Sequence, residues 1–219
     1  MIRNNIFVLV IILVLFNSLL WAENNGDWQY RAMGTINKSF SNNWRLQIGY
    51  QSHFGKSNTN HNLFRTITDL SLWYNVNKNL ICSIDYKQEY ARENEDWLIE
   101  RRPHFNLRIR WNWFKLLFED KSRIEFRYFE DSAYKSRYRN RILIRFPMQY
   151  FHISIHPYVG NEIFFNLNRV GFSRNRIYLG LMLRINKIQP EFFGFWQITD
   201  EEINWIQEFV VGFRLMLFI

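Results

Sequence analysis

The stretch from Arg137 to Phe165 constrains the fold most, because charged and apolar side chains alternate along it. In its first half, one face carries Arg139, Arg141 and Arg145, and the other carries Tyr138, Ile142, Ile144 and Phe146. Successive side chains of a β-strand point to opposite faces. A second alternating run follows a short break at residues 147–149. The stretch therefore predicts a β-hairpin with one apolar wall and one charged wall.

The same alternation recurs along the chain and gives eleven candidate strands. The connections between them alternate in length. Short ones are expected at 38–43, 76–79, 147–149 and 186–187, a somewhat longer one at 113–121, and the longest at 55–62, 91–96, 130–136, 166–171 and 198–204. Short turns at one end and longer loops at the other are typical of outer-membrane barrels, whose longer loops lie outside the cell.

These features predict an all-β fold, an antiparallel up-and-down transmembrane β-barrel of about twelve strands, with ten to twelve consistent with the pattern. A twelfth strand is expected because bacterial outer-membrane barrels have even strand numbers, whereas eleven leaves the first and last strands parallel. Pro103, Pro157 and Pro190 lie inside expected strands. Because proline removes a ladder hydrogen bond, each is expected to mark a bulge or a strand end.

The N-terminus has the plan of a secretory signal peptide. Arg3 precedes an apolar run over residues 6–16, and Ala22 offers a cleavage position. The run is shorter than the ~20 residues of a spanning helix, which disfavours a membrane anchor. We expect residues 1–22 to be removed and residues 23–219 to form one barrel domain. Cys82 is the only cysteine, which excludes an intrachain disulfide, and its phase places it on the apolar wall.

The charged wall is expected to face the barrel interior, because charge on the lipid side costs roughly 2–4 kcal/mol at mid-bilayer. The residues expected to line this lumen are Arg108, Arg110, Arg123, Glu125, Arg127, Arg139, Arg141, Arg145, Glu162, Arg174, Arg176 and Glu191. Arginines outnumber carboxylates here, so the lumen is expected to attract anions. The alternative is a structural network of ion pairs that fills the narrow interior of a small barrel.

Tryptophans are expected on the lipid side near the strand ends, where the membrane–water interface favours them. They are Trp28, Trp44, Trp73, Trp97, Trp111, Trp113, Trp196 and Trp205. The alternative is a soluble barrel with an aromatic core, which the signal peptide and the alternating loop lengths disfavour.

Signs of enzymatic chemistry are weak. His152 and Ser154 share a face at the spacing of a base and a nucleophile, but no third, orienting residue can be named. The histidines show no metal-ligand spacing with acids or with the cysteine. No cofactor is predicted. The mixture of basic and aromatic residues also suits nucleic-acid binding, which the export signal disfavours.

Five motifs resemble the domain-of-unknown-function family 2490 (DUF2490). They are E-R-R-P at 100–103, E-F-R-Y at 125–128, R-Y-R-N-R at 137–141, P-Y-V-G-N-E-I-F-F at 157–165 and N-R-I-Y-L-G at 175–180. The resemblance covers nearly all of the expected mature chain, including the last alternating strand. It implies a Gram-negative outer-membrane β-barrel without an established activity, and it supplies no catalytic residues. The end of the chain departs from such barrels, because the lipid-facing phase ends in Ile219 rather than in an aromatic residue.

The sequence thus predicts an uncharacterised, porin-like barrel in the bacterial outer membrane that is not an enzyme. Its expected role is a small anion-attracting channel or transport barrel, or a structural one. The alternatives are a barrel enzyme acting on lipid or lipopolysaccharide, and a periplasmic lipocalin-like binding barrel. The expected partners are outer-membrane lipids, the barrel-assembly machinery and small anionic solutes, with no nucleic acid.

Overall fold

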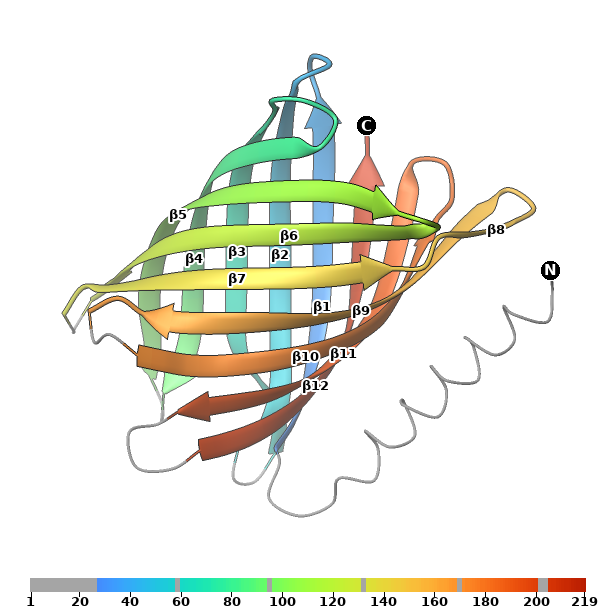
Figure 1. Ribbon diagram of the computed structural model, residues 1–219. Helices are drawn as coiled ribbons and strands as arrows, with labels where there is room; N and C mark the ends of the chain where they lie inside the picture. The colour runs from blue at the N-terminus through green and yellow to red at the C-terminus, as the bar shows by residue number, and fades with distance from the viewer. Residues whose placement is uncertain (1–26, 58–59, 94–95, 131–132, 169–170, 201–204) are drawn as a thin grey trace.

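A computed structural model describes residues 27–57, 60–93, 96–130, 133–168, 171–200 and 205–219, and it is all β (Figure 1). The strands are β1 (Asp27–Ser39), β2 (Trp44–Ser57), β3 (Asn60–Asn75), β4 (Leu80–Glu93), β5 (Asp96–Trp113), β6 (Leu116–Phe129), β7 (Lys135–Arg145), β8 (Met148–Tyr150), β9 (Ile153–Asn166), β10 (Gly171–Arg184), β11 (Ile188–Asp200) and β12 (Trp205–Phe218). None of these residues belongs to a helix that is long and apolar enough to cross a membrane. The predicted signal peptide, residues 1–22, lies outside the described residues.

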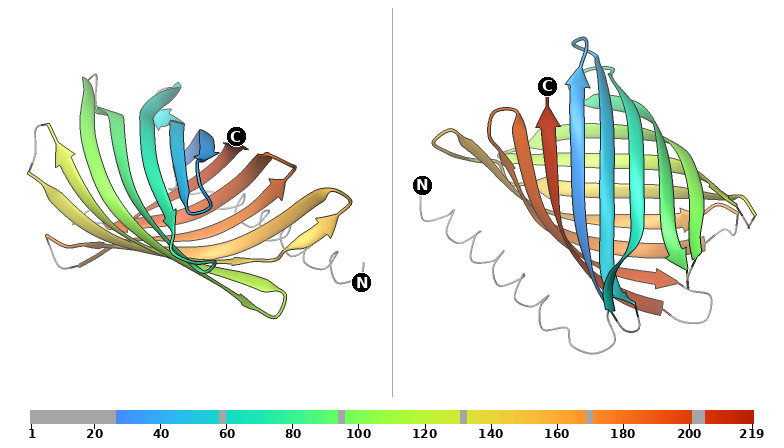
Figure 2. Two further views of the ribbon diagram at one scale, coloured as in Figure 1. Left: turned by 90° about the horizontal axis from the view of Figure 1, so that it is seen from above. Right: turned by 180° about the vertical axis from the view of Figure 1, so that it is seen from behind.

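One sheet closes into a barrel through a parallel pair, β1 with β12. Trp28 lies opposite Phe209 and Ile36 opposite Leu217, and both strands run the same way in the rear view of Figure 2. Every other neighbouring pair in the wall is antiparallel. The predicted all-β barrel is confirmed, and the eleven strands counted from the sequence form its wall. The expectation that the wall must hold an even number of strands was wrong, because the parallel pair β1–β12 closes a wall with an odd number of strands.

The twelfth strand, β8, lies outside the wall. It has three residues and pairs only with the start of β9, so the β8–β9 hairpin projects from the barrel (Figure 1). Residues 148–149, expected in a tight turn, therefore belong to a strand, and the turn follows at residues 151–152. Phe151 adopts a left-handed backbone there, with φ of 50°.

The predicted contrast between short and long connections is much reduced. β2 extends to Ser57 and β3 begins at Asn60, while β4 extends to Glu93 and β5 begins at Asp96. Most residues expected in these two loops therefore pair as strand. The sequence alternates regularly over only part of each of these strands. The paired strands extend beyond that part toward the end of the barrel. We name the two ends by their first connections, the β1–β2 end and the β2–β3 end.

The three prolines neither bulge nor end their strands. Pro103 lies inside β5, where pairing with β6 lapses between Arg101 and His104 without a change of register. Pro157 lies where the β7–β9 ladder stops, and Pro190 lies beyond the last paired residue of the β10–β11 ladder. The register shifts fall elsewhere, at His53/Phe54 and at Phe172/Arg174. A proline is thus accommodated where the ladder to one neighbouring strand lapses or ends, and its carbonyl can still accept a bond, as that of Pro157 does from Phe146 N at 2.9 Å.

The outer wall is apolar and exposed. Ile84 is 61% exposed and Phe105 is 52% exposed, although both lie in the middle of long strands. Aromatic side chains gather on this wall toward both ends. The β1–β2 end carries the pairs Trp44–Tyr74 and Trp111–Phe118, and the β2–β3 end carries Trp28–Phe209, Phe165–Phe172 and Phe172–Trp205. Two aromatic girdles around an apolar band are the surface pattern of a membrane barrel.

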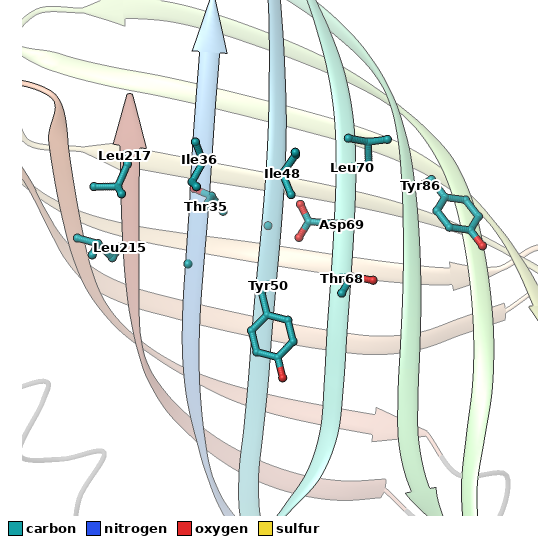
Figure 3. Close-up of a pocket in the computed structure, with 12 residues that line it drawn as sticks. Thr35, Ile36, Ile48, Tyr50, Thr68, Asp69, Leu70, Tyr86, Leu215 and Leu217 are labelled. Atoms are coloured by element: carbon teal, nitrogen blue, oxygen red, sulfur yellow. The ribbon is translucent and has the colours of Figure 1, made fainter. Parts of the chain in front are cut away.

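A shallow apolar groove of about 530 Å³ crosses this wall beside the β1–β12 seam (Figure 3). Ile36, Ile48, Leu215 and Leu217 line it. Gly34 also lines it, and a Cβ atom added there would meet no other atom within 4 Å.

A small polar cluster interrupts the apolar band on β6 and β7. Asn140 Nδ2 donates hydrogen bonds to both carboxylate oxygens of Asp120, at 3.1 and 2.9 Å, and to Ser122 Oγ at 3.1 Å. Ser122 Oγ is also 3.0 Å from the Tyr138 hydroxyl. The cluster therefore satisfies part of its own hydrogen-bonding capacity on the wall.

Candidate anion site in the barrel interior

One cavity of about 610 Å³ occupies the barrel interior. Its lining includes Arg45 and Arg184 near the β1–β2 end and Arg127 and Arg174 near the β2–β3 end. Eighteen arginines and lysines line it, against five aspartates and glutamates. Three further glutamates are buried beneath the arginines, namely Glu100, Glu125 and Glu162. The interior of the described barrel therefore holds a large excess of positive charge.

The structure places all twelve predicted lumen residues on the inner side of the wall. The ten in direct contact with the cavity are Arg108, Arg110, Arg123, Arg127, Arg139, Arg141, Arg145, Arg174, Arg176 and Glu191. Glu125 is 0% exposed and Glu162 is 3% exposed, each covered by arginines.

Part of this charge forms a structural network centred on two carboxylates. Glu125 accepts hydrogen bonds from Arg137 Nε at 2.9 Å and from Arg139 Nη1 at 2.9 Å. Arg139 also donates from Nη2 to Glu162 Oε1 at 2.6 Å, and the Tyr178 hydroxyl donates to Glu162 Oε2 at 2.6 Å. One arginine thus links the carboxylates of β6 and β9 across β7.

Two similar groups extend the network toward the β2–β3 end. Glu100 accepts from Arg102 Nε at 2.7 Å and from Arg127 Nε at 2.6 Å. Glu89 accepts from Arg102 Nη2 at 2.9 Å and lies 3.0 Å from Arg65 Nε. In each case a buried carboxylate is matched by two guanidinium groups, which is the arrangement that makes buried charge tolerable.

Aromatic rings inside the barrel hold further cations. Phe164 is 1% exposed, and four guanidinium carbons lie between 4.6 and 5.5 Å from its ring centroid. They belong to Arg137, Arg139, Arg174 and Arg176. Such contacts stabilise a cation without a carboxylate partner.

Apolar side chains fill one side of the interior. Leu143, Tyr158, Tyr178, Phe193, Phe195 and Val210 form a buried cluster. Gly180 and Gly212 make room for it, because a Cβ atom would meet the Tyr158 ring at 2.4 Å and the Phe193 ring at 2.3 Å respectively. Five of these six residues, all but Val210, also line the cavity, so its wall is partly apolar and partly basic.

A second basic group lies toward the β1–β2 end and has few carboxylates. Trp73 is 4% exposed inside the barrel, with Arg45, Arg108 and Lys121 over its ring at 5.3, 4.5 and 5.3 Å. Glu119 lies beside them, 1% exposed. Four arginines surround it, Arg110 at 2.8 Å, Arg145 at 3.2 Å, Arg141 at 3.7 Å and Arg108 at 3.8 Å. We call Trp73, Glu119 and these six cations the Trp73 cluster.

The sequence analysis missed the centre of this cluster. Trp73 was expected on the lipid side, and that expectation was wrong because Trp73 shares the inward phase of Asp69 and Ser71, both buried. Glu119 was expected in a connection, whereas it lies inside β6 in phase with Lys121 and Arg123. The alternation already identified the phase in both strands, so the signal was present in the sequence.

The candidate enzyme residues are not brought together. Ser154 Oγ donates to Gln149 Oε1 at 2.8 Å, and the described residues include no hydrogen bond between Ser154 and His152. His152 lies exposed in the turn between β8 and β9. Within the described ranges, no group of three histidine, cysteine or acidic residues is placed to hold a metal ion.

Comparison with known proteins gives a family without an assigned activity. No curated protein matches this chain. The model of the family described as "Protein of unknown function (DUF2490)" matches residues 56–207, which run from the end of β2 into β12. The match therefore includes most of the wall and both basic groups described above, except Arg45. The chain belongs to the DUF2490 family.

Proposed function

We propose that this chain is an integral barrel of the bacterial outer membrane whose basic lumen attracts and conducts small anions. The observation that carries the proposal is an interior cavity of the described barrel, lined by eighteen cationic and five acidic side chains. A narrow passage with one sign of charge and low-dielectric walls concentrates counter-ions. Selection would be passive, and no catalytic step is proposed.

The outer wall supports the membrane assignment. Exposed isoleucines, leucines and aromatic residues cover the band between the two girdles. A soluble binding barrel of the lipocalin type would expose this surface to water, and large contiguous apolar patches are rare on soluble monomers. The proposed surroundings are outer-membrane lipids, reached through the barrel-assembly machinery after export. The β1–β2 end is proposed to face the periplasm.

Ion flux through reconstituted vesicles tests the conduction. Arg31 and Lys87 line the cavity outside the Trp73 cluster, and neither is within 4 Å of a carboxylate among the described ion pairs. The double variant Arg31→Gln/Lys87→Gln should lower chloride entry relative to potassium release. The matched control Lys38→Gln/Lys78→Gln removes the same charge from exposed positions and should leave the ratio unchanged. An inserted barrel that passes neither ion would overturn the proposal of a channel.

Cell fractionation tests the location. The protein is expected in the outer-membrane fraction, and it should migrate differently on a denaturing gel before and after heating. A protein recovered in the soluble periplasmic fraction would contradict the membrane assignment.

A further inference from the structure

The Trp73 cluster differs from the rest of the lumen in its charge balance. Elsewhere a buried glutamate has one to three cations within 4 Å, from Arg214 alone at Glu191 to three arginines at Glu125. In the Trp73 cluster, Glu119 lies within 4 Å of four arginines, and the other two cations, Arg45 and Lys121, have no carboxylate within 4 Å among the described ion pairs. The cluster therefore keeps a local excess of positive charge that protein groups do not neutralise.

The hydrogen bonds of the cluster are incomplete as well. Arg108 and Arg141 lie 3.8 and 3.7 Å from Glu119, which is beyond hydrogen-bond distance. The buried Nε atoms of Arg45, Arg108, Arg141 and Arg145 have no hydrogen-bond partner within the described part of the chain. Buried donors in folded proteins are normally satisfied, so donors left over around a cavity indicate a ligand that supplies acceptors.

We propose that the Trp73 cluster binds a doubly charged tetrahedral oxyanion, of which inorganic phosphate is the simplest. This inference rests on the proposed function, since it names the class of anion that the lumen selects. A guanidinium group presents parallel donors that match the oxygens of a phosphate. Guanidinium groups converge here from β2, β5 and β7, and Lys121 adds an ammonium group from β6.

Trp73 explains how the cluster is held without more carboxylates. Its ring carries three cations at 4.5 to 5.3 Å, so Arg45, Arg108 and Lys121 are oriented by an uncharged group. Cation–π contacts leave the N–H groups at the guanidinium edge available to an incoming acceptor. A carboxylate in the same place would occupy those N–H groups. Glu119 then limits the repulsion among the arginines around it.

Equilibrium dialysis of inorganic phosphate against the full-length, detergent-purified barrel tests the site directly. Saturable binding is expected at one site per chain. The double variant Arg108→Gln/Arg141→Gln should weaken it about tenfold or more, because each change removes a charged donor. Arg45→Gln, nearer the barrel end, is a second variant that should weaken binding in the same direction if the double variant does not fold. The control Arg31→Gln, a lumen arginine outside the cluster, should change the dissociation constant less than threefold.

Two results would overturn the proposal: no saturable phosphate binding to the wild-type barrel, or binding by folded Arg108→Gln/Arg141→Gln and Arg45→Gln variants equal to that of the wild type. The vesicle flux separates this outcome from failure of the proposed function. Anion flux without phosphate binding would rule out the phosphate site and leave the proposed channel standing. Phosphate binding at the cluster in a barrel that passes no ions would rule out the channel and leave the phosphate site standing.

Discussion

Arg139 donates from Nη2 to Glu162 Oε1 at 2.6 Å, across the pairing of β7 and β9. The same guanidinium reaches Glu125 on β6 at 2.9 Å, so it is held from both sides. Arg141 lies one inward position further along β7, and among the described residues its closest carboxylate oxygen, on Glu119, is 3.7 Å away, beyond hydrogen-bond distance. Both arginines line the cavity, but Arg139 is held by two carboxylates and braces the wall, whereas Arg141 is not held in this way.

The bracing role of Arg139 predicts that the barrel loses much of its stability when the Glu162 carboxylate is removed. Glu162→Gln leaves Arg139 and Arg176 buried without their shared partner, and breaking a buried ion pair costs about 3–5 kcal/mol. Unfolding of the detergent-solubilised barrel by urea measures the difference. The control Glu130→Gln removes an exposed partner of Arg101 at 3.5 Å and should cost about 0–1 kcal/mol. Equal effects of the two substitutions would argue against a structural network.

The proposed membrane placement predicts that an arginine on the outer wall lowers stability only near the middle of the apolar band. Ile84→Arg, at a 61% exposed position in β4, should lower stability in lipid by roughly 2–4 kcal/mol. Ile188→Arg, at the start of β11 beside the turn, should cost about 0–1 kcal/mol. In a soluble barrel both exposed substitutions would lie within about 0.5 kcal/mol of the wild type. Folding into vesicles under denaturant titration distinguishes the two cases.

Close packing inside the barrel predicts opposite outcomes for two glycines. Gly180→Ala places a Cβ atom against the Tyr158 ring and should cost about 1–3 kcal/mol by overpacking. Gly34→Ala adds the same methyl group where nothing lies within 4 Å, on the outer face, and should be close to neutral. Thermal unfolding of the two variants in the same detergent checks this. A neutral Gly180→Ala would show that the ring has room to move.

The parallel seam predicts a specific cross-link. In a Cys82→Ser background, Ile36→Cys and Leu217→Cys place two cysteines opposite each other on β1 and β12, within the usual span of a disulfide. Oxidation should join them and change the mobility of the folded protein on a gel. The pair Ile36→Cys/Phe213→Cys is offset along the same seam, because Phe213 lies opposite Ala32, and should not cross-link. The reverse result would mean a different closure of the barrel.

Local alternation predicted the strands and their faces well, because a period of two depends only on neighbouring residues. Closure could not be predicted, since the pairing of β1 with β12 joins residues about 180 positions apart and no local pattern encodes it. The site was predicted in part. Arg108 and Arg141 followed from their phase, but Trp73 was assigned by residue type rather than by phase, and Glu119 by its place between apolar runs.

The reversal potential of single barrels in planar bilayers under a potassium chloride gradient tests the central claim most directly. A lumen lined by eighteen cations should move the reversal potential toward the chloride equilibrium value, and Arg31→Gln/Lys87→Gln should move it back toward zero. A reversal potential on the potassium side, or inserted barrels that carry no current, would contradict an anion-conducting lumen.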